Sequence, residues 1–338
     1  MQYRKLGKSN LKVSALCLGT MMFGDQTGRD EAQAIVADAH EHGVNYIDTA
    51  DVYTDGAAET MVGELLKGQR NDWVLATKLG NRMSNRVNEG HLSRSWMLRE
   101  VDASLKRLQA EHVDILYLHR DFNGMDFEEP LRALDALLQG GKIRYWGVSN
   151  FRGWRIAEAM RVAGQLGMPG PVVCQPYYNL LNRMPEVEVL PACEHYGIGV
   201  TPYSPIARGV LTGKYRPGQP PAQDTRAGRG DKRIAETELR EESLRIAQRL
   251  ETHAQAQGIA LAHFATAWVL AHRAVSSVIA GPRTLKQWQD YLPALDYTVT
   301  AEDEALVDSF VTPGHPSTPG YHDPAYPLQT RVAGPASR

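Results

Sequence analysis

Short apolar runs alternate along this chain with segments in which apolar residues recur at three- and four-residue spacing. The runs read, in order, VSALCLG, VNYID, WVLATK, VDILYLH, IRYWGVSN, PVVCQ, GIGVTPYS and SSVIAG. The helical spacing is clearest over residues 31–42, 96–108, 131–138 and 285–295. Eight strands, each followed by a helix, predict a parallel sheet, because right-handed crossovers join strands that run in the same direction.

The predicted strands are apolar throughout, which is typical of strands covered on both faces. A closed (β/α)8 barrel, the TIM-barrel form of the α/β class, covers its strands in this way. A doubly wound sheet is the alternative, but its G-x-G-x-x-G fingerprint occurs nowhere in the sequence. We therefore predict a single barrel over residues 1–311, since barrels of this length commonly form one domain.

Three segments depart from the strand–helix alternation. Residues 1–12 contain the turn-forming GKSN, so we expect an N-terminal hairpin at the bottom of the barrel. Residues 204–236 follow strand seven and are rich in Gly, Pro and charge, which predicts a long mobile loop; RGD at 229–231 is interpreted as a chance sequence within it. Residues 312–338 form a tail without helical period, yet Tyr321 and Tyr326 predict that it packs on the barrel.

Composition and charge narrow the function classes. Apolar residues make up 43% of the chain and the formal net charge is −2, so we expect a folded protein that binds neither nucleic acid nor an anionic membrane. Three cysteines and the lack of metal-ligand spacing argue against a disulfide framework and against a metal site. The first residues lack the apolar core of a signal peptide and no run is long enough to span a bilayer, which predicts a cytoplasmic protein.

Ionisable side chains gather where the predicted strands end. Asp48 ends strand two, Lys78 ends strand three, His119 ends strand four, and Tyr53 lies in the loop after strand two. In such barrels the working residues collect at the carboxyl ends of the strands. Each residue also has a simpler interpretation, such as a helix cap for Asp48 or packing on a loop for Tyr53. Four ionisable groups on one rim nevertheless indicate a site, because charges rarely point inward without partners.

Together these four residues suit the protonation of a carbonyl oxygen. A phenol with a pKa of about 10 is a weak acid at neutral pH. The Lys78 ammonium is expected to lower the pKa of Tyr53 and make it a usable proton donor, while Asp48 keeps Lys78 charged and oriented. His119 is expected to hydrogen-bond the substrate oxygen. Since no side chain delivers hydride, this chemistry requires a nicotinamide.

The remaining strand ends offer groups that suit a dinucleotide. Ser149 and Asn150 end strand five and Gln175 ends strand six, and these side chains can hydrogen-bond a carboxamide. Tyr203 ends strand seven and offers an aromatic face for a nicotinamide ring. After strand eight, GPRT opens a helix, where the amino end of the helix and Arg283 predict a phosphate site.

Over nearly its whole length the chain resembles the aldo-keto reductases, which are (β/α)8 barrels that reduce carbonyls with NADPH. The stretches that carry the resemblance are GTMMFG, IDTADVY, ATK, the LH at 118–119, GVSNF, QPYYNLL, YSPIARGVLTGKY and GPRTLKQWQD. The resemblance implies that Asp48, Tyr53, Lys78 and His119 form the family's catalytic tetrad. It also implies an NADPH-dependent oxidoreductase whose partner is a small-molecule aldehyde or ketone.

The family's motifs, matched position by position, further imply a set of NADPH contacts. Met21 would face the nicotinamide end, Arg283 would face a 2′-phosphate, and the segment after Tyr203 would fold over the pyrophosphate. The implied contacts are Thr20, Met21, Asp48, Ser149, Asn150, Gln175, Tyr203, Ser204, Ile206, Arg208, Lys214, Arg226, Gly281, Arg283, Gln287 and Asp290. Tyr291 stands where the family usually has Asn, which removes one adenine contact.

Two other functions fit parts of the sequence. Some relatives of the aldo-keto reductases are channel-associated regulatory subunits that retain the cofactor, and that branch carries Asn where this chain has His119. A Schiff-base aldolase that uses Lys78 is another alternative, but this interpretation does not account for the stretches YSPIARGVLTGKY and GPRT. The substrate itself is not predicted, because it depends on variable loops. Several aromatic or apolar residues are candidates for lining the substrate pocket, and they favour a hydrophobic aldehyde or ketone. They are Met22, Phe23, Trp96, Tyr321 and Tyr326.

Overall fold

An eight-stranded parallel sheet forms the centre of the computed structural model, which describes residues 1–122 and 124–327. The strands are Leu16–Gly19 (β3), Tyr46–Asp48 (β4), Val74–Leu79 (β5), Val113–Leu118 (β6), Ile143–Ser149 (β7), Val173–Gln175 (β8), Gly199–Val200 (β9) and Val278–Ala280 (β10). Each strand coincides with one of the apolar runs of the sequence, and only β5 extends past its run, by Leu79. The predicted parallel arrangement of the α/β class is therefore confirmed.

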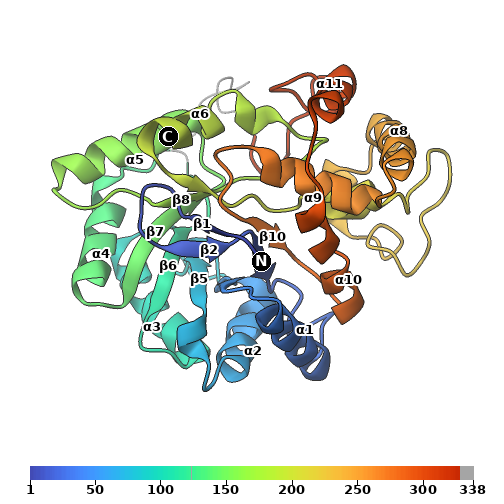
Figure 1. Cartoon of the computed structure of the whole chain (residues 1–338). Helices are drawn as coiled ribbons and strands as arrows, with labels where there is room; N and C mark the ends of the chain where they lie inside the picture. The colour runs from blue at the N-terminus through green and yellow to red at the C-terminus, as the bar shows by residue number, and fades with distance from the viewer. Residues whose placement is uncertain (123, 328–338) are drawn as a thin grey trace.

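The sheet curls until its two edge strands meet. Its strands pair in the order β10–β3–β4–β5–β6–β7–β8–β9. Between the edges, the Ser276 amide donates to the Val200 carbonyl at 2.8 Å and the Ile279 amide donates to the Pro202 carbonyl at 3.0 Å. These bonds join the segments of β9 and β10, so the arrangement is that of a (β/α)8 barrel, with its strands at the centre of Figure 1.

Helices surround the strands on the outside (Figure 1). The helices that follow the successive strands are Arg29–Glu41 (α1), Ala57–Leu65 (α2), Arg94–Leu108 (α3), Glu128–Gln139 (α4), Gly153–Gln165 (α5), Val189–Tyr196 (α6) and Leu285–Gln289 (α10). Between β9 and β10 lie Lys232–Thr237 (α7), Glu241–Ala256 (α8) and Leu261–Ala271 (α9), and Ala301–Phe310 (α11) comes last. Short 3-10 helices span Tyr53–Gly56 (η1), Arg70–Asp72 (η2), Met184–Glu186 (η3), Ala207–Thr212 (η4) and Leu292–Asp296 (η5).

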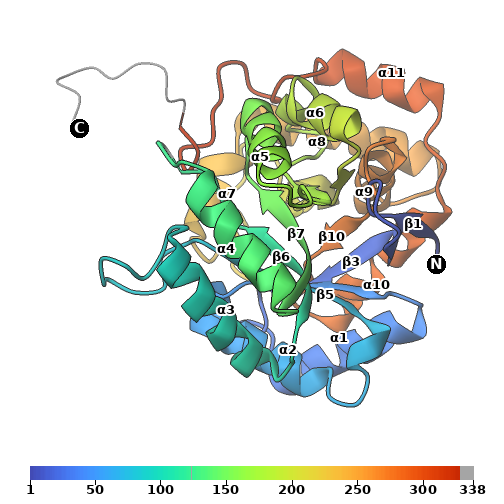
Figure 2. The same cartoon turned by 90° about the vertical axis from the view of Figure 1, so that its left-hand side faces the viewer.

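The first residues of the chain form an antiparallel hairpin of Tyr3–Lys5 (β1) and Lys12–Ser14 (β2). Leu6 and Val13 in this hairpin are fully buried, and they belong to the same apolar cluster as the strand residue Cys17. Figure 2 shows the hairpin and α7 at opposite ends of the barrel. The hairpin therefore covers the end of the barrel away from the loops that hold the predicted site.

Two parts of the helical prediction differ from the structure. The spacing over residues 285–295 predicts one helix, but the structure has α10 and the separate η5. Pro293 lacks an amide hydrogen and its ring clashes with a preceding helical turn, so α10 cannot continue through it. The helix α11 has no predicted counterpart. Its start is marked by Thr300 and Asp303, whose side chains each accept a hydrogen bond from the other's backbone amide.

The sequence predicts a long mobile loop over residues 204–236, but this segment contains secondary structure. It includes η4 and most of α7. Arg208 Nε lies 3.1 Å from Glu238 Oε2, and Arg226 Nε lies 2.9 Å from Asp231 Oδ2. Two short helices therefore interrupt the expected loop, and ion pairs that no local pattern reveals help to organise it.

Residues 312–327 of the predicted tail lie against the barrel without forming a helix. Asp323 accepts two hydrogen bonds from the Arg233 guanidinium, at 2.6 and 3.0 Å. The Arg240 guanidinium lies 3.8 Å from the centre of the Tyr321 ring. These contacts agree with the expectation that the tail packs on the barrel. The remainder of the predicted tail lies outside the described residues.

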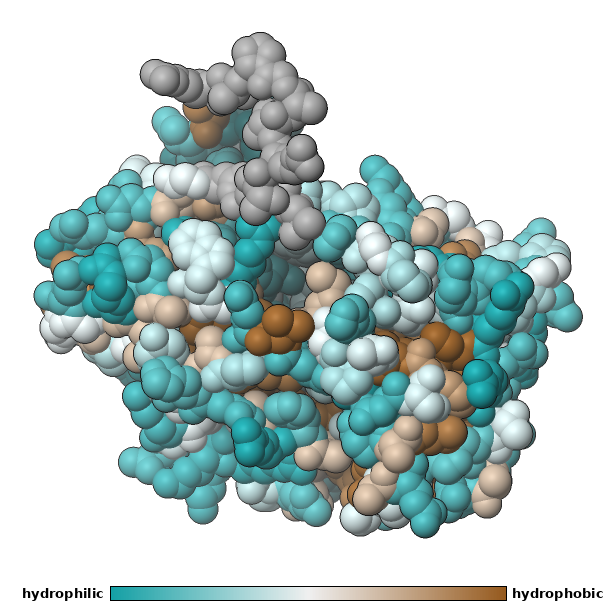
Figure 3. Space-filling model, turned by 90° about the horizontal axis from the view of Figure 1, so that it is seen from above, coloured by the Kyte–Doolittle hydropathy of each residue, from teal (hydrophilic) through white to brown (hydrophobic). Residues whose placement is uncertain are grey.

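The described part of the chain includes no helix that is both long and apolar enough to cross a bilayer. The face seen from above in Figure 3 is mostly hydrophilic, with small separate apolar patches. Large apolar side chains that are exposed lie scattered along the sequence. They are Met1, Tyr3, Met21, Val87, Trp154 and Val187.

Candidate active site

The four residues of the predicted tetrad meet at the carboxyl end of the strands. Asp48 is the last residue of β4, and Lys78 lies one residue before the end of β5. His119 directly follows β6, and Tyr53 begins η1 in the loop after β4. Lys78 is 0% exposed and Asp48 is 2% exposed, so their opposite charges pair inside the protein.

The Lys78 ammonium connects the other members of this group. Its Nζ donates to the Asp48 carboxylate, to the Tyr53 hydroxyl at 3.1 Å and to the Thr49 carbonyl at 2.8 Å. These acceptors use all three N–H bonds of an ammonium. Burial by itself lowers the pKa of Lys78, but Asp48 and Tyr53 outweigh burial and raise it above its usual value. Lys78 is therefore charged at neutral pH.

The pKa of Tyr53 shifts in the direction opposite to the prediction. Burial raises the pKa of Tyr53, and the nearby Lys78 ammonium offsets only part of that rise. The Asp48 carboxylate adds to the rise, because a neighbouring negative charge disfavours a phenolate. The phenol is therefore held in its protonated form. Lys78 limits the rise of the pKa but does not produce a net fall.

His119 faces Tyr53 across the same space. The centroids of the two rings are 5.9 Å apart and the ring planes are nearly perpendicular, at 80°. Burial, with Lys78 and Arg120 adding to it, lowers the pKa of His119 well below its usual value. The imidazole is therefore neutral at pH 7. Its Nδ1 is buried and has no hydrogen-bond partner among the described residues. A neutral imidazole has one N–H to donate to a substrate oxygen.

The loop after β4 holds Tyr53 in place with an unusual backbone. Thr54 and Asp55 have positive φ angles of 50° and 52°, and Gly56 follows at 91°. Such angles are costly for residues other than glycine and persist where the surroundings enforce them. The Thr54 hydroxyl donates to the Phe23 carbonyl at 3.1 Å and ties the turn to the loop after β3. The strained turn therefore presents the phenol to the strand ends.

A cavity of about 730 Å³ opens beside the tetrad. Tyr53 and His119 lie in its wall, whereas Lys78 is fully buried. All of the predicted cofactor contacts line this cavity. They are Thr20, Met21, Asp48, Ser149, Asn150, Gln175, Tyr203, Ser204, Ile206, Arg208, Lys214, Arg226, Gly281, Arg283, Gln287 and Asp290. Residues from six strand ends, from the long loop after β9 and from α10 are thus brought to one surface.

Hydrogen bonds join the predicted carboxamide-binding residues to the tetrad. Asn150 Nδ2 donates to the His119 carbonyl at 3.0 Å, and Asn150 Oδ1 accepts from the Tyr203 hydroxyl at 2.8 Å. Gln175 Nε2 donates to Asp48 Oδ2 at 2.9 Å. The strand ends therefore form one hydrogen-bonded rim in which each amide has a defined orientation.

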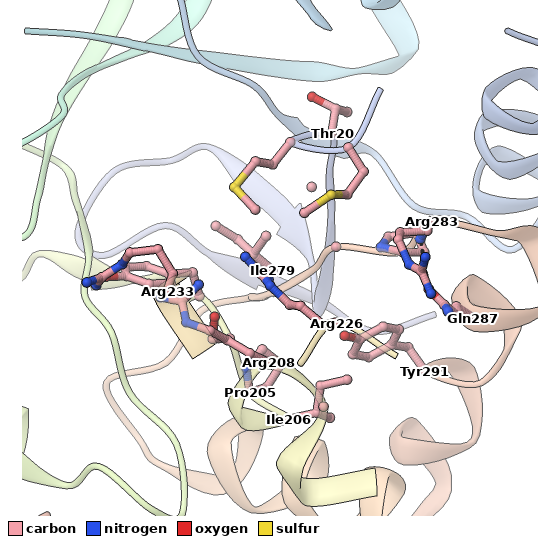
Figure 4. A pocket seen from close by; sticks show the side chains of 18 of the residues that line it. Thr20, Pro205, Ile206, Arg208, Arg226, Arg233, Ile279, Arg283, Gln287 and Tyr291 are labelled. Atoms are coloured by element: carbon pink, nitrogen blue, oxygen red, sulfur yellow. Dashed lines mark hydrogen bonds between the residues drawn. The ribbon is translucent and has the colours of Figure 1, made fainter. Parts of the chain in front are cut away.

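Cationic side chains line the rest of the cavity. Figure 4 shows Arg283 and Gln287 at one end of the view and Arg208 and Arg233 toward the other. Lys214 and Arg283 make no ion pair with the described carboxylates. Burial lowers the pKa of each, and neighbouring cations lower it further. Cations crowded in this way are stabilised by a bound anion.

These residues fit the phosphate groups of NADP. The amide and tyrosine rim suits the nicotinamide end, and the uncompensated Lys214 and Arg283 suit the phosphates. A Cβ added to Gly281 would meet no atom within 4 Å, so the backbone at Gly281 borders open space. Tyr291 also lies in the wall, at the position where the family usually has Asn.

Several residues of this wall carry no signal in the sequence. Arg229, within the RGD interpreted as a chance sequence, lines the cavity, and its Nη2 donates to Gln26 Oε1 at 3.2 Å. This bond joins the loop after β9 to the loop after β3. Arg233 and His263 also line the cavity. Only folding brings these segments together, so no local pattern marks their residues.

The predicted walls of the substrate pocket are only partly found here. Met22 and Tyr326 line the cavity. Phe23 and Trp96 are buried, at 0% and 4% exposure, and neither is part of its wall. Tyr321 lines a neighbouring cavity instead. Apolar residues near the strand ends can pack in the core as readily as they can contact a ligand, and Phe23 and Trp96 pack in the core.

Comparisons with known proteins show the family of this chain. Residues 15–312 match the family described as "Aldo/keto reductase family". Two relatives, from Arabidopsis thaliana and Oryza sativa subsp. japonica, are each named "Probable voltage-gated potassium channel subunit beta"; each is 39% identical over 88% of this chain and 92% of its own length. The "Uncharacterized oxidoreductase YrpG" of Bacillus subtilis (strain 168) is 33% identical over 95% of this chain and 99% of its own. The chain belongs to the aldo/keto reductase family, and this membership supports an oxidoreductase function.

Proposed function

We propose that this protein is an NADPH-dependent reductase that converts the carbonyl of an aldehyde or ketone to an alcohol. The observation that carries the proposal is the 3.1 Å contact from Lys78 Nζ to the Tyr53 hydroxyl, with Lys78 also bonded to Asp48. The neutral His119 faces Tyr53, and the cation-lined cavity continues from both. Nicotinamide-dependent reduction needs a proton donor, a hydrogen-bond donor for the substrate and an anion-binding cavity.

Tyr53 is the proton donor in this proposal. Its phenol gives its proton to the substrate oxygen, and the Lys78 ammonium stabilises the negative charge that develops on the phenol oxygen. Asp48 keeps Lys78 charged and in place. His119 donates a hydrogen bond to the same substrate oxygen and fixes its position. A nicotinamide bound in the cavity supplies the hydride.

The rim of amides orients the reacting groups. Asn150 and Gln175 are held by their bonds to His119 and Asp48, so a carboxamide bonded to them lies at a fixed place relative to the tetrad. The Tyr203 ring stacks on Tyr177 with centroids 5.6 Å apart. Orientation of this kind accounts for a large part of enzymatic rate enhancement.

Oxidation of NADPH across a panel of aldehydes, ketones, quinones and sugars tests the proposal. We expect at least one class of carbonyl to cause loss of NADPH, with the alcohol formed in equal amount. Omission of the carbonyl is the control and should leave NADPH intact. Binding of NADPH without turnover of any compound in the panel would contradict the proposal.

A cofactor-binding regulatory subunit is the second candidate function. Two relatives at 39% identity carry the names of potassium channel β subunits. His119 favours the enzyme, since the resemblance implies Asn at this position in the channel-associated branch. A His119→Asn variant should therefore lose turnover while it still binds NADPH. Equal turnover in the parent and in this variant would remove the argument from His119.

Carbonyl reduction should be independent of pH between about pH 7 and pH 9. The pKa of His119 lies well below 6.5 and that of Tyr53 lies above 10.0. His119 stays neutral above its lowered pKa and Tyr53 stays protonated below its raised pKa, so neither titrates in this range. The kcat/KM for the carbonyl, which reports groups of the free enzyme, should be flat there and fall only at more alkaline pH. A rise or fall of kcat/KM between about pH 7 and pH 9 would contradict the assignment of a neutral His119 and a protonated Tyr53.

Arg283→Ala is expected to reduce the preference for NADPH over NADH by roughly tenfold to a hundredfold. A guanidinium bonded to the 2′-phosphate contributes about 1.5–3 kcal/mol, and NADH lacks that phosphate. Kd values for both cofactors, measured on the parent and on the variant, test this. Arg245→Ala, at an exposed ion pair on α8, is the control. If Arg283→Ala kept the parent's ratio of NADPH to NADH affinity, the discrimination between the two cofactors would have to come from Lys214, Arg226 or Arg229.

A further inference from the structure

A second cavity, of about 420 Å³, adjoins the cavity beside the tetrad. The two cavities share three wall residues, Asn150, Tyr203 and Tyr326. Tyr326 belongs to the tail, so a side chain from outside the barrel stands between them. The centre of its ring lies 5.2 Å from the Arg120 guanidinium. A ligand that extends from Tyr53 past Tyr326 therefore enters the second cavity.

The wall of the second cavity is largely apolar. It is built from the loops after β6, β7 and β8, the start of α6 and the tail. Its apolar members include Phe151, Pro176, Met184, Pro185, Val187 and Val189. A wall of this kind suits the hydrocarbon part of a ligand, with a few polar groups to fix its orientation.

Two arginines of this wall have no carboxylate partner in the part of the chain that the structure describes. Arg120 directly follows His119, and Arg152 precedes the first residue of α5. Arg120 donates to the Ala325 carbonyl at 3.1 Å, and Arg152 donates to the Pro327 carbonyl at 2.7 Å. The Arg120 Nε is buried and lacks a partner among the same residues. A guanidinium has five N–H donors, so both keep donors for a ligand.

Three acidic residues also lie in this wall, and two of them are paired with arginines from outside it. Asp121 is paired with Arg155 at 2.8 Å, and Asp323 is paired with Arg233 at 2.6 Å; Arg233 is shared with Glu236 at 2.9 Å. Glu188 is the remaining acidic residue of the wall and offsets one of the two arginines. The amino end of α5, whose first turn has no acidic residue, also favours a negative charge here.

We propose that this enzyme acts on carbonyl compounds that carry a carboxylate at the far end of an apolar body. The carbonyl lies at Tyr53, the apolar body passes Tyr326, and the carboxylate is bound by Arg120 and Arg152. Because Glu188 also lies in this wall, a monoanion is favoured over a doubly charged phosphate ester. This inference rests on the proposed carbonyl reduction, because it names the substrate class of the same site.

Linear ω-oxo carboxylic acids of increasing chain length, each compared with its methyl ester, test the inference. The ester keeps the aldehyde and the chain but lacks the charge. At the best chain length, kcat/KM for the acid should exceed that for the ester by roughly tenfold to a hundredfold, the usual effect of a charge-assisted hydrogen bond. The difference should lie in KM and should shrink at high salt, because salt screens partly exposed charges.

Variants of the two arginines show whether the effect comes from this cavity. Arg120→Gln and Arg152→Gln should each lower the acid-to-ester ratio of kcat/KM, and the double variant should bring it close to one. Glu188→Gln should raise the ratio, because it removes the opposing charge. Arg161→Gln, at an exposed ion pair further along α5, is the matched control and should keep the parent's ratio. Arg152→Gln carries the test alone if Arg120→Gln does not fold.

Two results would overturn the inference. One is a ratio near one in the parent at every chain length, and the other is a ratio that survives in Arg152→Gln and in the double variant. Failure of the proposed function gives a different result, since the enzyme would then reduce neither the acids nor the esters. Turnover of the esters without a preference for the acids would leave the carbonyl reduction in place and remove only the carboxylate site.

Discussion

Tyr53→Phe is expected to lower kcat for carbonyl reduction by at least ~100-fold, which is the usual effect of losing a proton donor. The substitution removes only the hydroxyl that accepts from Lys78 Nζ at 3.1 Å and leaves the ring in place. NADPH binding should be nearly unchanged, because Lys214 and Arg283, the cations expected to hold its phosphates, lie in other segments of the cavity wall.

Two measurements on the same preparations test this prediction: turnover from NADPH oxidation, and NADPH affinity from a fluorescence titration. Tyr3→Phe is the matched control, because the Tyr3 hydroxyl lies in the hairpin and donates to the Gly43 carbonyl. It should leave both quantities as in the parent. If Tyr53→Phe kept more than half of the parent's turnover, Tyr53 would not be the proton donor.

Lys78→Met is expected to be as damaging to turnover as Tyr53→Phe, and the double variant should be hardly worse than either. Lys78 acts on the substrate only through the Tyr53 phenol, so once one of them is lost the other contributes little. The ring of Tyr53 also lies near the ammonium, with Nζ 4.7 Å from its centroid. Fully additive losses in a double-mutant cycle would show that the two residues act independently.

Lys78→Met should also reduce stability, which needs its own control. Removing one partner of a buried ion pair typically costs about 3–5 kcal/mol. Burial already raises the pKa of Asp48, and the loss of Lys78 removes the group that most opposes that rise. Adding Asp48→Asn to Lys78→Met should therefore recover part of the Tm without recovering turnover. Recovery of both would mean that Lys78 matters only for folding.

Much of the fold could be predicted because a barrel of this kind repeats one local unit. Each strand appears as an apolar run, and the change from that run to a three- and four-residue spacing marks its helix. The rule that active sites form at the carboxyl ends of barrel strands then places Asp48, Lys78 and His119 on one rim. This placement needs no knowledge of a contact between them.

The structure departs from the sequence-based prediction in two places for different reasons. The composition of residues 204–236 is that of an irregular loop, yet Arg208 pairs with Glu238 and Arg226 pairs with Asp231. The length of the last barrel helix is a different case, because Pro293 is visible in the sequence and the apolar spacing runs through it. A proline inside a helical pattern should therefore have limited the predicted helix.

By itself the sequence determined the order of strands and helices and the kinds of side chain at the strand ends, because both depend on neighbouring positions. Only the tertiary structure decided that Arg229 reaches Gln26 and that Tyr326 stands between two cavities. It also decided the direction of the Tyr53 pKa shift. That shift is the difference between burial and the attraction of Lys78, and both depend on how the whole chain packs around the phenol.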